Sequence, residues 1–236
     1  MQLTFSNERI LAVVAHPDDA ELLCAGTLAR ARADGAAVAI CVLCRGDKGQ
    51  PTPPIDDLAE IRRAEMSAAA DVLGAELLCG DFGDGELIDG PESRRTLIEF
   101  YRRFRPSLVL AHAANDYHPD HRAASQLAEA VSWFCASRGH QTSSAPMRTP
   151  PALWWMDTVN MIGCLPHFYI DVSEHVELKR AMIGCHVSQL ARGENEDFSP
   201  LEELMLRQCQ TRGSQAGVAA AEAFQSHAAW KRTRAW

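Results

Sequence analysis

Short apolar runs alternate with helix-forming segments along the first half of the chain, and this alternation restricts the possible folds more than any other feature. The apolar runs, each long enough for one buried strand, lie at 10–15, 38–44, 75–80 and 107–113. Segments with helical periodicity lie between them, at 20–35, 56–74 and 93–104. Such alternation is typical of βαβ units, in which helices cover a parallel sheet. The sequence therefore predicts an α/β fold with a Rossmann-like, mostly parallel sheet and helices on both faces.

The pattern is looser after residue 150. A loop at 138–151 precedes two apolar segments, 152–161 and 167–173, and two helical segments, 174–190 and 201–210. No repeat or low-complexity tract marks a boundary between the halves. We therefore expect residues 1–236 to form a single domain.

Composition and charge limit the partners of the protein. The net charge is -8, without a long Lys/Arg cluster, which argues against a nucleic-acid surface and favours a small polar substrate. No apolar run reaches the roughly 18 residues of a membrane span, and the N-terminus lacks the layout of a signal peptide. We expect a cytoplasmic protein with no nucleic-acid or membrane partner. The eight cysteines should then be reduced thiols, including the pair Cys41 and Cys44 within one apolar run.

Two polar clusters follow predicted strands. His16, Asp18, Asp19 and Glu21 come after the run at 10–15, and the segment Asn-Asp-Tyr-His-Pro-Asp-His at 115–121 comes after the run at 107–113. Reactive groups of an open parallel sheet lie just past the carboxyl ends of its strands. A lone histidine there usually has only a structural role. The repeated His-Pro-Asp instead favours two loops that converge on one pocket.

The residue types in these clusters predict a metal site. His16 and Asp19 are three residues apart where a loop becomes a helix, so both can face one point, and His121 can complete the set. Two histidines and one carboxylate with open positions are typical of catalytic zinc. Non-haem iron oxygenases use a similar set, although usually in β-rich folds. A nucleotide-binding module is disfavoured because the first turn lacks G-x-G-x-x-G and carries carboxylates.

Three neighbouring residues are candidates for proton transfer. Asp18 lies beside the expected metal and can take a proton from water that attacks a carbonyl. We expect His118 to protonate the leaving amine or to stabilise the oxyanion. Asp120, close to it in sequence, would raise the pKa of its imidazole. Asp18 and Asp120 could also cap helices, and the two roles are compatible.

The motifs AHPDDAE and DYHPDHRAA together resemble the LmbE/PIG-L family of zinc-dependent deacetylases, which release acetate from N-acetylglucosaminyl conjugates. The resemblance implies that His16, Asp19 and His121 hold Zn²⁺, or Fe²⁺ or another divalent metal in the cell. It also implies Asp18 as the general base, with His118 and Asp120 as the acid or oxyanion-stabilising pair. An antibiotic or a chitooligosaccharide with another N-acyl amino sugar is the alternative substrate.

The resemblance continues along the chain. Arg62 in RRAE and Asp84 in FGDGEL match family motifs, which implies that Arg62 contacts the sugar or its attached group and Asp84 the sugar hydroxyls. Arginine is a planar cation suited to carboxylate or phosphate, so we expect an anionic substituent on the sugar. The alternative is that Arg62 only forms a solvated ion pair with Glu60 or Glu65 on its own helix. FYIDVSEHVELKRAMIGCHVSQ and GVAAAEAF resemble the small bacterial branch with the bacillithiol-biosynthesis deacetylases. This branch implies a glucosaminyl malate type of conjugate. Resemblance to the family also implies a homo-oligomer, a trimer or a hexamer.

A few residues carry weaker predictions. His186 could line the pocket, but a structural position on the inner face of a helix is as common. We expect Trp154 and Trp155 to serve packing. The family often has Gly-Gly in the first helix, whereas this chain has Ala25-Gly26, a departure that bears on helix packing behind the metal loop.

Overall fold

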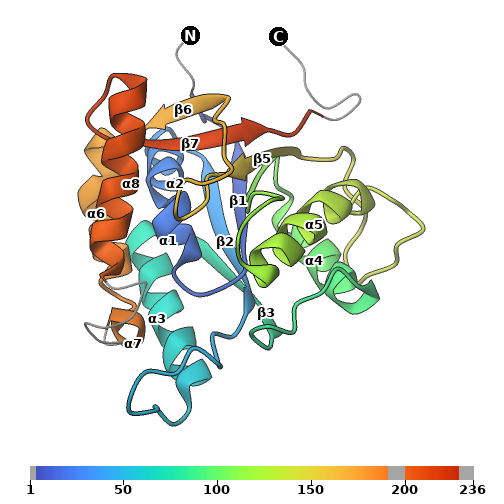
Figure 1. The fold of residues 1–236 in the computed structure, drawn as a ribbon. Coiled ribbons are helices and arrows are strands. Elements are labelled where there is room, and N and C mark those ends of the chain that lie inside the picture. Colours follow the sequence, from blue (N-terminus) through green and yellow to red (C-terminus); the bar gives the residue numbers. More distant parts are fainter. Residues whose placement is uncertain (1–3, 191–199, 229–236) are drawn as a thin grey trace.

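The computed structural model describes residues 4–190 and 200–228, in which seven strands form one sheet of order β3-β2-β1-β4-β5-β7-β6 (Figure 1). The strands are β1 (Arg9–Val14), β2 (Ala37–Cys44), β3 (Glu76–Phe82), β4 (Leu108–Ala111), β5 (Ala152–Met156), β6 (Phe168–Asp171) and β7 (Ala221–Ser226). The helices are α1 (Asp19–Leu23), α2 (Ala25–Ala33), α3 (Leu58–Leu73), α4 (Pro91–Phe104), α5 (Pro119–Phe134), α6 (Val176–Ile183), α7 (Val187–Leu190) and α8 (Leu201–Ala216), with a 3-10 helix η1 (Ser173–His175).

The sheet is mostly parallel, as the sequence predicts. β1 pairs in parallel with β2 on one side and with β4 on the other, and β3 and β5 extend this arrangement outward. β7 runs antiparallel to both β5 and β6. The sheet is therefore mixed only at the edge formed by the last two strands.

Helices cover both faces of the sheet, which explains why β1 is apolar at nearly every position. Its even-numbered residues from Ile10 to Val14 belong to one hydrophobic core. Its odd-numbered residues, continuing from Leu11 to Ala15 just past the strand, belong to the other. Figure 1 shows α1, α2, α3, α6 and α8 on one face, and α4 and α5 on the opposite face. A strand buried on both sides reads as a continuous apolar run rather than as an alternation.

The segment 20–35, expected to form a single helix, is divided into α1 and α2. The break lies at Cys24, which has a φ of -147°. Glu222 on β7 stabilises the new helix start, because its carboxylate accepts a hydrogen bond from the backbone N–H of Gly26 at 2.9 Å. A Cβ atom on Gly26 would lie only 2.8 Å from Cβ of Val172. Close packing behind the first loop therefore requires glycine at this position, whereas the preceding residue can be alanine.

The C-terminal region also differs from the expectation. The segment 174–190 is not one helix, because α6 ends at Ile183 and α7 begins only at Val187. The strand β7 was not predicted at all. Its buried Glu222 interrupts the apolar pattern that identifies a strand, since this carboxylate caps α2 instead of facing water.

The described part of the chain contains no helix long and apolar enough to cross a membrane. None of the eight cysteines, all of which lie within the described residues, forms a disulfide. Cys41 and Cys44 are both buried on β2.

Candidate active site

The two polar clusters meet at one edge of the sheet. β1 ends at Val14, and its loop leads into α1 at Asp19, while β4 ends at Ala111 and its loop leads into α5 at Pro119. The two strands are parallel neighbours, with Val13 opposite Ala111. Both loops therefore leave the sheet at the same edge, where ligands bind in open α/β folds.

The three expected metal ligands converge on one point. Nε2 of His121 lies 3.3 Å from Nδ1 of His16 and 3.3 Å from Oδ1 of Asp19, and His16 Nδ1 lies 3.6 Å from Asp19 Oδ2. Ligands about 2.0–2.1 Å from a tetrahedral zinc ion are themselves roughly 3.3 Å apart. The donor set therefore fits a divalent metal ion of this size.

A carboxylate orients each of the two histidines. Oδ2 of Asp120 lies 2.9 Å from Nε2 of His16, and Oδ1 of Asp116 lies 3.0 Å from Nδ1 of His121. Each carboxylate accepts a hydrogen bond from the N–H of the outer ring nitrogen, which leaves the inner nitrogen free to bind a metal. Such outer partners raise ligand basicity and hold the ring in place. Asp116 lies in the second polar cluster, and this role was not predicted from the sequence.

Replacement of Asp116 by asparagine is expected to weaken zinc binding about 10-fold to 100-fold, because the neutral amide supports the imidazole of His121 less well. Competition with a chromogenic chelator measures this affinity. Asp71→Asn, an exposed position on α3, serves as the matched control. Equal affinities in the two variants would contradict the role of Asp116.

His112 is a buried residue of the site that the sequence analysis missed. Its Nε2 atom accepts a hydrogen bond from the backbone N–H of Ala15 at 3.1 Å and lies 3.2 Å from Oδ2 of Asp19. Its ring stacks on that of His121, with centroids 4.0 Å apart. His112 thus packs directly behind two expected ligands. The sequence could have indicated His112, because this histidine is the first residue after the apolar strand β4.

The charges of the cluster favour a cation at its centre. Burial lowers the pKa of His16, but hydrogen bonds with Asp120 and Asp19 outweigh burial and raise it to about 10. Burial likewise opposes the charge on His121, whereas Asp19 and Asp116 raise its pKa to about 9. These carboxylates stabilise positive charge, whether it is carried by protons on the imidazoles or by a metal ion.

Asp18 lies beside this set in an unusual conformation. It is 9% exposed and has a φ of 88°, in the left-handed region that aspartate tolerates better than most residues. Its side chain makes no capping hydrogen bond to α1. Burial and the neighbouring Asp19 raise its pKa to about 7. A carboxylate that titrates near neutrality and does not cap its helix is suited to proton transfer.

The expected pairing of His118 with Asp120 is not the main contact of either residue. Nδ1 of His118 lies 4.0 Å from the Asp120 carboxylate and instead accepts the backbone N–H of Asp120 at 3.2 Å, as the cap of α5. The carboxylate of Asp120 instead contacts His16 and accepts a hydrogen bond from the backbone N–H of Gly85 at 2.7 Å. Burial, then the positive charges of His16 and His121, lower the pKa of His118. Asp120 therefore supports the expected metal ligand His16 more directly than it supports His118.

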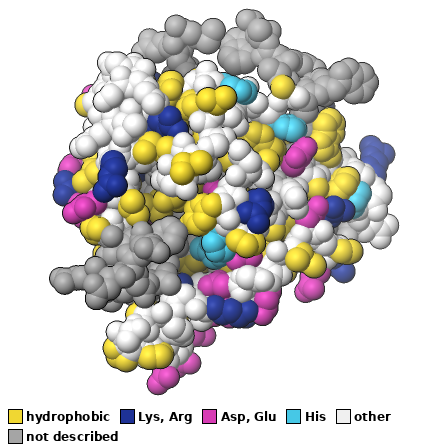
Figure 2. All heavy atoms as spheres, viewed as in Figure 1, with side chains coloured by type: hydrophobic (Ala, Val, Ile, Leu, Met, Phe, Trp, Pro, Cys, Tyr) yellow, Lys and Arg dark blue, Asp and Glu magenta, His cyan; other side chains and the backbone are white. Residues whose placement is uncertain are grey.

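The cluster opens into a cavity of 480 Å³, which both Arg62 and Asp84 line. Arg62 is only 1% exposed and donates hydrogen bonds to the carbonyl oxygens of Gly46 and Gly49. A side chain buried to this degree is not part of a solvated ion pair on the surface of α3. Asp84 accepts the backbone N–H groups of Gly46 and Lys48. Figure 2 shows a histidine in a surface depression, with acidic and basic side chains grouped beside it.

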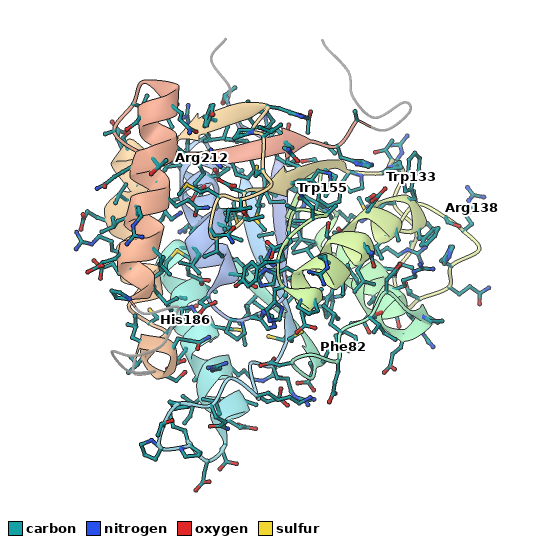
Figure 3. The ribbon with its side chains drawn as sticks, viewed as in Figure 1. Phe82, Trp133, Arg138, Trp155, His186 and Arg212 are labelled. Atoms are coloured by element: carbon teal, nitrogen blue, oxygen red, sulfur yellow. The ribbon has the colours of Figure 1, made fainter. Side chains whose placement is uncertain are left out.

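The residues with weaker predictions do not line the cavity. His186, labelled in Figure 3 between α6 and α7, is fully buried, and its Nε2 lies 3.3 Å from Oε1 of Glu21 on α1. Trp154 packs edge-on against Phe168, with ring centroids 4.7 Å apart. Trp155 is 8% exposed. Neither tryptophan lines the cavity, so packing remains the better explanation for both.

Known proteins resemble this chain over most of its length. The conserved protein TT1542 from Thermus thermophilus superposes with a TM-score of 0.81 at 33% identity, covering 97% of this chain and 100% of that chain. Diacetylchitobiose deacetylase of Thermococcus kodakarensis is 29% identical over 211 residues, 85% of this chain and 75% of that protein. The 4-oxalmesaconate hydratase of Pseudomonas putida is 26% identical over 189 residues, which cover 76% of this chain and 73% of the hydratase.

A family model covers the part of the chain that carries the site. The PIG-L model, described as GlcNAc-PI de-N-acetylase, matches residues 11–132. This range begins in β1 and includes both polar loops, from His16 to His121. Because the matched range makes up more than half of the chain and TT1542 is similar throughout, the protein belongs to the PIG-L family.

Proposed function

We propose that the protein is a metal-dependent N-deacetylase that releases acetate and a free amine from N-acetylglucosaminyl conjugates. The observation that carries this proposal is the convergence of His16, Asp19 and His121, with Asp18 beside them, at the floor of a cavity. Membership of the PIG-L family and similarity to a diacetylchitobiose deacetylase support the same reaction.

His16, Asp19 and His121 would hold the metal, with zinc as the first candidate and Fe²⁺ as an alternative. When bound by these residues, a divalent metal would supply Lewis acidity toward an amide carbonyl and would lower the pKa of water. The Asp18 carboxylate would take the proton of the attacking water. His118, whose side chain is 35% exposed and lines the cavity, would donate a proton to the departing amine. Asp120 would keep His16 in the tautomer that binds metal.

Assignment to the bacillithiol-biosynthesis branch, and assembly as a trimer or hexamer, stay predictions.

The hydratase relative offers a second candidate function, since water activated in the same site could add to a carbon–carbon double bond. Hydration leaves no free amine and no acetate, so the products distinguish the two reactions.

The deciding experiment is a product assay on protein stripped of metal and reloaded with zinc, iron or cobalt. N-acetylglucosamine, diacetylchitobiose and aryl N-acetylglucosaminides serve as substrates, and acetate and primary amine are both measured. Equal amounts of acetate and amine, dependent on metal, would support deacetylation. No release from any conjugate by the reloaded protein would overturn the proposal.

The pH dependence of the reaction should identify the acid. Activity is expected to fall at low pH as Asp18 becomes protonated and at high pH as His118 loses its proton. Because burial lowers the pKa of His118 while that of Asp18 is raised to about 7, only a minor fraction of the protein carries both groups in the active form at any pH, and the bell should have a low maximum. His118→Gln should lose the alkaline limb and keep the acidic one. A variant with an unchanged pH profile of kcat/KM would exclude His118 as the acid.

A further inference from the structure

One wall of the cavity is the loop 45–49, and Arg62 holds this loop in place. Its guanidinium donates to the carbonyl oxygens of Gly46 at 2.6 Å and Gly49 at 2.8 Å, and to Oε1 of Gln189 on α7 at 2.6 Å. Three acceptors of the protein therefore surround a side chain that is only 1% exposed. An incoming carboxylate or phosphate would have to displace them.

Asp84 also stabilises the loop 45–49. Its Oδ1 accepts the N–H of Gly46 at 2.8 Å and its Oδ2 accepts that of Lys48 at 3.2 Å. The backbone N–H of Asp84 in turn donates to Oδ1 of Asp47 at 3.0 Å. Lys48, the second cation that lines the cavity, forms an ion pair with the exposed Glu86. Both cations of the wall thus already have acceptors within the protein.

Carboxylates outnumber cations among the described residues that line the cavity. The acidic side chains are those of Asp18, Asp19, Asp84 and Asp120, and the basic ones, histidines aside, are those of Lys48 and Arg62. This excess of two negative charges attracts a divalent metal ion, which neutralises it, so the metal-loaded cavity offers no net positive charge to a negative group on a substrate. The net charge of -8 repels such a substrate at longer range.

We propose that the cavity selects electrically neutral amino-sugar conjugates, and that Arg62 and Asp84 position the loop 45–49 instead of binding an anionic substituent. The inference rests on the proposed deacetylation. Neutral sugar hydroxyls can donate hydrogen bonds to carboxylate and carbonyl oxygens of the cavity, and they do not need to separate Arg62 or Lys48 from its acceptors in the protein. An anionic substituent, as expected from the sequence, would need an Arg62 that is available to the substrate, whereas this guanidinium already donates to three acceptors of the protein.

The test compares two substrates that differ only in charge: an N-acetylglucosaminide with a carboxylate on its aglycone, and the methyl ester of the same compound. The zinc-loaded protein should show the higher kcat/KM on the ester. Its rate on the carboxylate should rise with salt, since screening weakens repulsion, while the rate on the ester stays constant. Glu86→Gln releases Lys48 and should raise kcat/KM for the carboxylate about fivefold without changing that for the ester.

Two variants complete the comparison. Glu177→Gln removes one charge from an exposed ion pair with Arg180 on α6, outside the cavity, and should change neither rate. Arg62→Met should lower kcat/KM by the same factor for both substrates if Arg62 positions the loop. A selective loss on the carboxylate, or a wild-type preference for the carboxylate, would overturn the inference while leaving deacetylation intact. Failure to release acetate from either substrate would instead overturn the proposed function, and this inference with it.

Discussion

Replacement of His121 by alanine is expected to strip the protein of its metal and to lower deacetylation by a factor on the order of 10³ or more. A metal ion contributes several kcal/mol of charge stabilisation to such reactions, and each 1.4 kcal/mol is about tenfold in rate. His121 also occupies the centre of the cluster. Its Nε2 is the atom that lies 3.3 Å from both His16 and Asp19.

Metal content by elemental analysis and kcat/KM on an aryl N-acetylglucosaminide are the two measurements for this variant. His140→Ala is a suitable control, because His140 is an exposed histidine away from the cavity. Thermal unfolding of both variants shows whether the loss arises from the site or from the fold. Stoichiometric zinc together with full turnover in His121→Ala would remove His121 from the ligand set.

Local patterns were sufficient to predict the central part of the fold. β1 is buried on both faces and is therefore apolar along its length, which makes a strand visible in sequence. Reactive groups of a parallel sheet lie just past the carboxyl ends of its strands, and this predicted that His16, Asp19 and His121 lie together although about a hundred positions separate them in sequence. The prediction holds because β1 and β4 are parallel neighbours. Their roles as ligands stay predictions, although their geometry suits a metal.

Contacts between distant segments could not be read from local patterns. Asp120 was assigned to His118, two residues away, whereas its carboxylate contacts His16, which is 104 positions away. The acceptors of Arg62 are mainly backbone carbonyl groups, which have no signature in a sequence. β7 was not recognised as a strand because the charged Glu222 interrupts its apolar run. This carboxylate accepts a hydrogen bond from the start of α2. In each case a polar side chain satisfies a group on another element, and only the assembled structure identifies that group.

Asp18 offers the clearest separation of metal binding from catalysis. Its carboxylate stands beside the ligand set, and no hydrogen bond to α1 occupies it. Its backbone has a φ of 88°, a conformation that asparagine adopts more readily than alanine does. Asn is therefore the substitution that removes the charge and the basicity with the least change in the loop.

Asp18→Asn is expected to retain one metal ion per chain and to lower kcat by a factor on the order of 10² to 10⁴, the usual contribution of a positioned proton-transfer group. KM should change little, because the amide occupies the same space in the cavity. The low-pH limb of the profile should also disappear, since the group whose pKa is raised to about 7 no longer titrates. Metal analysis and steady-state kinetics on the same preparation test all three points. Loss of the metal would make Asp18 a ligand, and an unchanged kcat would mean that another group accepts the proton.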